Sequence, residues 1–174
     1  MNITQSFKPL QLTVTNWRSY LFAVIFIAGN LITPQLVHGI PRGGLIFLPI
    51  YFFTLIAAYK FGLHVGLLTA VLSPLVNNWL FGMPPSFVLP AILIKSCLLA
   101  IVASTIAKRY NKVSPWLLLL VVLGYQIPGS IIECITTQSI TKGFQDFKIG
   151  LPGMLIQIVG GWLILKQMAG YEKR

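Results

Sequence analysis

The stretch Ser86–Lys112, SFVLPAILIKSCLLAIVASTIAKRYNK, decides the fold class of this chain. Its first part, Ser86–Ala107, is almost entirely apolar and is long enough to cross a bilayer, which takes about 20 residues. Its end, Lys108–Lys112, is a basic loop of the kind that favours the cytoplasmic side of a membrane. Because the bilayer core offers no water to free backbone groups, the apolar part is expected to be helical. The stretch therefore predicts one membrane-spanning helix followed by a cytoplasmic loop.

The whole chain, like that stretch, is rich in apolar residues and poor in charged ones. Of its 174 residues, 56% are hydrophobic and only 9% are charged, whereas a soluble domain carries about a quarter charged residues. Its 3 acidic residues leave little room for carboxylate-based metal chemistry, and its 2 cysteines have no metal-ligand spacing. The sequence therefore predicts an integral membrane protein with no metal and no cofactor.

Five further apolar segments complete an expected all-α, six-transmembrane-helix bundle. The expected spans are Trp17–Val37, Gly44–Tyr59, Gly62–Phe81, Ser86–Ala107, Ser114–Ile135 and Ile149–Met168, with a polar segment, Thr136–Lys148, before the last. The spans form a single membrane domain over 17–170, between a polar N-terminal tail at 1–16 and a charged C-terminal tail at 171–174. The N-terminal tail lacks the apolar core and cleavage site of a signal peptide, so we expect a short tail at the membrane interface.

The basic residues predict that both termini are cytoplasmic. With this orientation the inner side holds Lys8, Arg18, Lys60, Lys108, Arg109, Lys112, Lys166, Lys173 and Arg174, and the outer side holds only Arg42, Lys142 and Lys148. Such an excess of Lys and Arg in cytoplasmic loops is the usual topology signal. Nucleic-acid binding is the rival explanation of the basic excess, but no stretch interleaves aromatic and basic residues.

Polar residues gather in the outer halves of the expected spans. Lys95 and Glu133 are the charged residues in these outer halves, where a charge within the bilayer is costly and usually faces the protein interior. We expect an outward-facing pocket with apolar walls and a few polar groups. Its candidate ligand-binding residues are Lys95, Glu133, Asn77, Asn78, Trp79, Gln126, Gln157, Gln35, His38 and Arg42.

Helical spacing supports this convergence. Gln126, Ser130 and Glu133 share one face of the fifth span, as do Thr69, Ser73 and Asn77 in the third and Gly153, Gln157 and Gly161 in the sixth. The glycines beside Gln157 would let either a ligand or another helix approach closely.

Each polar residue also has a purely structural interpretation. Asn30, Gln126 and Gln157 can join helices by hydrogen bonds, and Glu133 can reach interfacial water. Lys95 can extend its long stem to the membrane surface. His38 and Arg42 can be plain loop residues.

Small residues form three stripes that allow close helix contact. They are Gly62, Gly66 and Ala70 in the third span, Ser96, Ala100 and Ser104 in the fourth, and Ser19 and Ala23 in the first. The first two predict packing within the bundle. The stripe in the first span can instead face a partner subunit.

The stretch Tyr59–Ala70, YKFGLHVGLLTA, carries an F-G-x-x-x-G-x-x-x-A pattern, and Leu72–Met83, LSPLVNNWLFGM, follows it. Together with the size and the six spans, these motifs resemble the substrate-binding S component of an energy-coupling factor (ECF) vitamin transporter. The resemblance covers nearly the whole chain, roughly Trp17–Met168.

The resemblance implies a subunit of the bacterial cell membrane that binds a vitamin or related nutrient tightly from outside. It implies as partners a transmembrane coupling subunit and two cytoplasmic ATPases, with delivery by toppling of the S component in the membrane. The loop Gln35–Gly44 would gate the pocket. Ser19 and Ala23 stand in for the family's A-x-x-x-A motif, which docks on the coupling subunit, with serine in place of the first alanine.

The residues themselves leave two other functional classes open. One is a stand-alone small-solute carrier or channel that uses Lys95 and Glu133 as a charge relay, and the other is a membrane enzyme that uses Glu133 or His38. No catalytic residues are assigned, because the sequence contains no HExxH, no GxSxG and no phosphate-binding loop. If the chain belongs to an ATP-driven transporter, as the resemblance implies, ATP would be hydrolysed by the partner subunits, because this chain has no phosphate-binding loop.

Overall fold

The computed structural model describes residues 4–171. The expected charged tail, with Lys173 and Arg174, therefore lies outside the described residues except for Tyr171. The helices are α1 (Trp17–Val37), α2 (Gly43–Phe47), α3 (Pro49–Phe61), α4 (Leu63–Phe81), α5 (Leu89–Tyr110), α6 (Pro115–Thr137), α7 (Ile140–Gly143), α8 (Gln145–Ile149) and α9 (Leu151–Tyr171). Two short strands, β1 (Gln5–Ser6) and β2 (Lys112–Val113), pair antiparallel.

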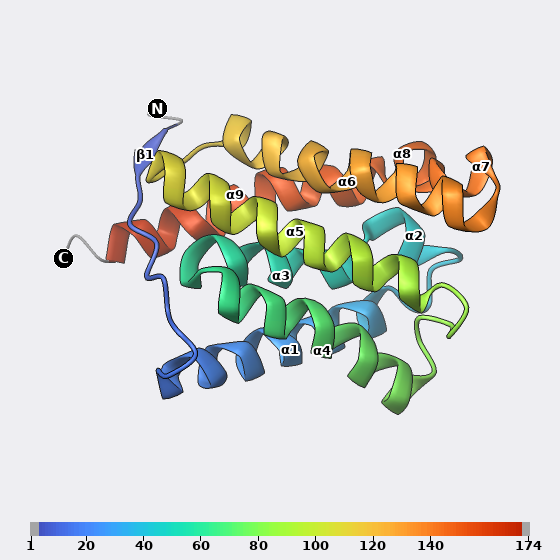
Figure 1. Cartoon of the computed structure of the whole chain (residues 1–174), viewed down its shortest axis with the longest axis horizontal. Coiled ribbons are helices and arrows are strands. Elements are labelled where there is room, and N and C mark those ends of the chain that lie inside the picture. Colours follow the sequence, from blue (N-terminus) through green and yellow to red (C-terminus); the bar gives the residue numbers. More distant parts are fainter. Residues whose placement is uncertain (1–3, 172–174) are drawn as a thin grey trace.

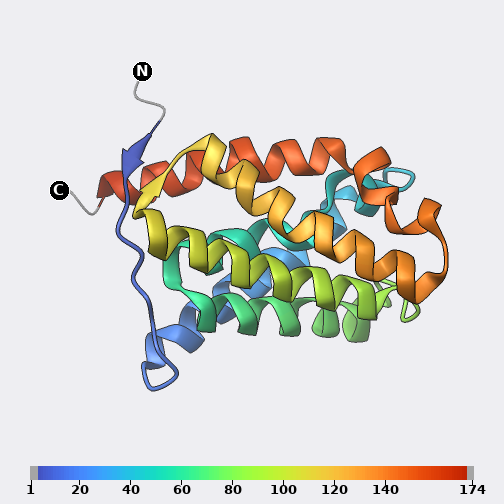
Figure 2. The same cartoon turned by 45° about the horizontal axis from the view of Figure 1, so that its top comes forward.

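The described residues contain six spans long and apolar enough to cross a membrane, with α2 and α3 together forming the second. The prediction of a six-helix membrane bundle is confirmed at this level. Figure 1 shows the long helices side by side along the longest axis of the molecule. Figures 1 and 2 place β1 and the end of α9 together at one end, called here the terminal end, and α7 and α8 at the opposite end, called here the loop end.

The second span, expected as one helix over Gly44–Tyr59, is broken into α2 and α3. Leu48 adopts a left-handed conformation with φ of 47° between α2 and α3. Pro49 follows it, and a proline disfavours right-handed helical backbone in the preceding residue. The chain therefore turns at Leu48, and the short helix α2 becomes part of the loop end.

The centre of the bundle is α3, the most buried of the spans. It contacts α1, α4, α5 and α9. A Cβ at Gly66 of α4 would lie 2.5 Å from the Cβ of Ala58 in α3 and 3.3 Å from the Cβ of Ala100 in α5. The small-residue stripes in the third and fourth expected spans thus pack helices of this chain together, as predicted.

The stripe in α1 also faces inward. Ser19 and Ala23 are 0% and 3% exposed and share one helical face with the buried residues Phe26 and Asn30. The hydroxyl of Ser19 donates to the carbonyl of Thr13 at 2.7 Å. The expectation that Ser19 and Ala23 form an exposed docking surface is not met, because both are buried within their own chain, whereas the larger residues Trp17, Tyr20, Leu21, Val24 and Ile25 of α1 are exposed.

The structure confirms that Asn30 joins helices by hydrogen bonds. Its amide nitrogen donates to the hydroxyls of Thr54 in α3 at 3.0 Å and of Ser73 in α4 at 3.1 Å. Its amide oxygen accepts from the backbone nitrogen of Phe53 at 3.3 Å. These bonds join three spans, and in a membrane such a network replaces the water that polar groups lack.

The described part of the expected N-terminal tail, residues 4–16, is bound across the terminal end. Phe7 is buried against the ring of Tyr59, with centroids 5.5 Å apart. The ammonium of Lys60 lies 4.8 Å from the Phe7 ring centroid and donates to the carbonyl of Lys8 at 3.2 Å. Together with the β1–β2 pair, these contacts make the segment a strap over the loops that follow α3 and α5.

Candidate ligand site

The loop end is built from segments that cannot continue as helices. Pro84 and Pro85 follow α4, and a proline lacks the backbone donor that a helix interior needs. Arg42 holds a left-handed conformation with φ of 60° at the start of α2. Short helices α7 and α8 fold back between α6 and α9 (Figure 2). Pro84, Pro85, Arg42 and two residues of α8 line a common cavity.

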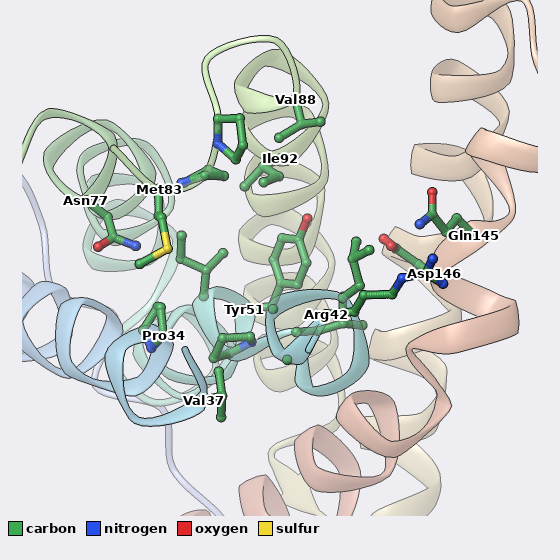
Figure 3. Close-up of a pocket in the computed structure, with 18 of the residues that line it drawn as sticks. Pro34, Val37, Arg42, Tyr51, Asn77, Met83, Val88, Ile92, Gln145 and Asp146 are labelled. Atoms are coloured by element: carbon green, nitrogen blue, oxygen red, sulfur yellow. The ribbon is translucent and has the colours of Figure 1, made fainter. Parts of the chain in front are cut away.

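A cavity of about 490 Å³ occupies this end. Its walls are mostly apolar, with a few polar and charged groups, as is usual for a small-molecule site. The polar lining residues are His38, Arg42, Tyr51, Asn77, Lys95, Glu133, Gln145 and Asp146. In Figure 3 Pro34, Asn77 and Met83 lie on one side of the cavity, Gln145 and Asp146 lie on the other, and Tyr51 and Arg42 lie between them.

Lys95, Glu133 and Asp146 form an ion cluster, called here the triad. The ammonium of Lys95 donates to Oε2 of Glu133 at 2.5 Å and to Oδ2 of Asp146 at 2.7 Å. The three side chains are 3%, 18% and 12% exposed. They come from α5, α6 and α8, so the triad ties the fold-back segment to two spans. A charge held this deep needs such partners to offset its lost hydration.

The depth of the triad follows from helix geometry. Lys95 lies six residues after Leu89, the first residue of α5, which corresponds to about 9 Å along the axis. A Cβ at Gly129 of α6 would lie 2.6 Å from Cγ of Lys95. The missing side chain at Gly129 therefore gives the lysine stem room to lie across α6 and reach Glu133.

Two further polar groups border the triad. Tyr51 is 3% exposed, and Figure 3 shows its hydroxyl pointing into the cavity. Within residues 4–171 that hydroxyl has no hydrogen-bond partner, and the guanidinium of Arg42 has neither an ion pair nor a hydrogen bond. Both groups can therefore bind a ligand without first breaking a bond to the protein.

Half of the predicted ligand residues line the cavity. These are Lys95, Glu133, Asn77, His38 and Arg42. The prediction that Lys95 and Glu133 lie together is confirmed, and the ion pair excludes the alternatives in which the lysine reaches the surface alone or Glu133 meets only water. Whether these residues bind a ligand stays a prediction.

Three predicted residues near the loop end do not line the cavity. Trp79 is 82% exposed, because two residues along a helix rotate a side chain by about 200° away from Asn77. Asn78 donates to the carbonyl of Pro84 at 2.7 Å and so holds the loop after α4. Gln35 donates to the amide oxygen of Asn77 at 3.4 Å and reaches the site only through it.

The other two, Gln126 and Gln157, are fully buried deeper in the bundle. The amide oxygen of Gln157 accepts from the hydroxyl of Tyr125 at 2.9 Å, which joins α6 to α9. This bond supports the structural interpretation of Gln157, in which it joins two helices. The glycines beside it admit a helix: a Cβ at Gly153 would lie 2.5 Å from the backbone carbonyl of Phe47 in α2.

Asp146 and Tyr51 are the residues that sequence reasoning missed. Asp146 sits in a polar segment that was expected to lie outside the membrane. One signal pointed to it: the chain has only 3 acidic residues, so an acid close in sequence to the last span is a candidate partner for a buried lysine. Tyr51 carried no signal, because its place in the cavity depends on the break at Leu48.

Among the described residues, no group of three or more His, Cys, Asp or Glu side chains could hold a metal ion. The donors of the site are instead suited to charged and hydrogen-bonding organic groups. No family model, no curated protein and no solved structure matches this chain. A function therefore rests on the geometry of the cavity and on the sequence motifs.

Proposed function

We propose that the chain is the substrate-binding subunit of an ATP-driven ECF-type importer in the bacterial cell membrane, with both termini cytoplasmic. The cavity carries the proposal: it lies at the loop end of a six-span bundle and is lined by the triad and by apolar residues of several helices. A charge-lined cavity this close to one end of the bundle suits capture of a small nutrient from the side that the loop end faces.

The motifs of α4 support the same function. Gly66 and Ala70, which belong to the pattern that resembles S components, pack α4 into the bundle, and Asn77 at the end of the same helix lines the cavity. In this proposal a coupling subunit and two ATPases supply the energy, and the loop Gln35–Gly44 gates the site. The coupling surface is not assigned to Ser19 and Ala23, since they are buried.

The test begins with the small molecule that copurifies with the chain, identified by mass spectrometry. That molecule should bind the purified chain without ATP, and Glu133→Gln should weaken binding while Lys142→Met, an exposed control on α7, should not. Proteoliposomes should accumulate it only when the coupling subunit, the ATPases and ATP are present. Accumulation by the chain alone, driven by an ion gradient, would refute the importer proposal.

A stand-alone ion-coupled carrier is the second candidate, and one observation favours it. Asp146 joins Lys95 and Glu133, so three ionisable groups, two of them carboxylates, meet beside one cavity. Such clusters serve proton and ion coupling in other membrane proteins. The proteoliposome assay distinguishes the two candidates, because only the carrier transports without partner subunits.

A further inference from the structure

The formal charges that line the cavity sum to zero, but the negative and the positive excess lie at different residues. With both acids ionised, the triad has two negative charges and one positive charge, and no other described residue donates a hydrogen bond to either carboxylate. One carboxylate is enough to neutralise Lys95, so the second leaves the triad with a formal charge of −1. Arg42, the other charged residue of the lining, carries the balancing positive charge.

Arg42 is placed beside the triad by its backbone. Left-handed conformations are uncommon in residues other than glycine and often occur at binding sites. The next residue, Gly43, is buried, and a Cβ there would collide with the carbonyl oxygen of Val37. The chain at Arg42 is therefore held in one path, and Figure 3 shows this residue between Tyr51 and Asp146.

We propose that the cavity takes a small zwitterion whose ammonium and carboxylate groups lie close together, as in an α-amino acid, and whose remaining body is apolar. The ammonium group binds the carboxylates of Glu133 and Asp146. The carboxylate binds the guanidinium of Arg42 and accepts a hydrogen bond from the hydroxyl of Tyr51. This inference rests on the proposed function and names the substrate class of the same site.

The other charge classes fit less well. An anion without an amine meets Arg42 but is repelled by the negative triad, and a cation without an acid leaves Arg42 and Tyr51 unused. A neutral molecule uses none of the four charges. The apolar body faces the side of Pro34 and Met83 (Figure 3), and a cavity of about 490 Å³ holds a molecule of this size.

The test uses three matched sets of compounds on the purified chain, with binding measured by calorimetry. They are phenylalanine, phenethylamine and 3-phenylpropionate; tryptophan, tryptamine and indole-3-propionate; and leucine, isoamylamine and 4-methylpentanoate. In a set that binds, the zwitterion should bind at least about tenfold more tightly than its amine or its acid, since each charge-assisted hydrogen bond contributes that much. Arg42→Gln should remove the advantage over the amine, and Arg109→Gln, an exposed control at the terminal end, should not.

An amine or an acid that binds as tightly as its zwitterion would overturn the inference. So would a copurifying molecule that lacks either charge, and this result would leave the importer proposal intact. If none of the three sets binds, the inference also fails, while the importer proposal is judged separately by the copurifying molecule and the proteoliposome assay. An unchanged preference in Arg42→Gln would remove Arg42 from the site.

Discussion

Replacing Lys95 by methionine should destabilise the chain far more than removing either carboxylate. The ammonium of Lys95 is the shared partner of Glu133 and Asp146, so Lys95→Met leaves two carboxylates facing each other with no cation between them. Removing one partner of a buried ion pair costs about 3–5 kcal/mol. Because both carboxylates border the cavity and keep some exposure, we expect the lower end, about 3 kcal/mol.

For a chain of this length about 1 kcal/mol corresponds to 2–4 °C in melting temperature, so Lys95→Met should melt about 6–12 °C below wild type in detergent. Glu133→Gln leaves the ion pair of Lys95 with Asp146 intact and should cost about 1 kcal/mol or less. The triple variant Lys95→Met, Glu133→Gln, Asp146→Asn should recover most of the loss, because replacing a whole buried ion cluster by neutral groups is often close to neutral.

Lys142→Met is the matched control, since Lys142 is exposed on α7 at the same end of the bundle. It should melt within about 1 °C of wild type, as expected for a surface substitution. The reasoning is refuted if Lys95→Met melts like the control, because the triad would then contribute nothing. It is refuted equally if the triple variant is no more stable than Lys95→Met, because the loss would then come from packing around the lysine stem and not from the unpaired carboxylates.

Three further outcomes follow from the packing and from the charge distribution. Gly153→Ala should destabilise the chain by about 1–3 kcal/mol, because its Cβ would overlap the backbone of α2. Gly170→Ala is the control in the same helix and should not destabilise the chain, since a Cβ there meets nothing within 4 Å. Equal melting temperatures of the two variants would contradict the contact at Gly153. Phe7→Ala should release the strap, with early cleavage of the N-terminal segment in limited proteolysis, because about 3–5 kcal/mol of buried contact is lost there; an unchanged cleavage pattern would show that the strap does not depend on this ring. In a cysteine-free background, a cysteine at position 142 should react with an impermeant reagent from outside the cell and one at position 112 only after permeabilisation, and the reverse pattern would invert the proposed topology.

Local sequence properties were enough for the class of the fold. Six spans follow from hydropathy, because apolar length is all that a bilayer requires. The meeting of Lys95 and Glu133 could be predicted for a similar reason: a charge inside a span needs a partner, and these two were the charged residues in the outer halves of the expected spans. The close contact at Gly66 was also predictable, since a small residue allows a neighbouring backbone to approach whichever helix supplies it.

Only the tertiary structure decided which face of each helix turned inward and where the loops folded. Ser19 and Ala23 form the same stripe whether they meet a partner or the rest of their own chain, and their burial depends on α3 and α4 lying beside them. Asp146 belongs to a polar segment with no helical period to place it, and it enters the site because α8 folds back over α6. The sequence by itself therefore determined that six segments are long and apolar enough to cross a membrane and that a buried lysine needs an acid, since both are properties of single segments. The tertiary structure decided that two acids meet that lysine beside a cavity, since this depends on the relative positions of three separate helices, α5, α6 and α8.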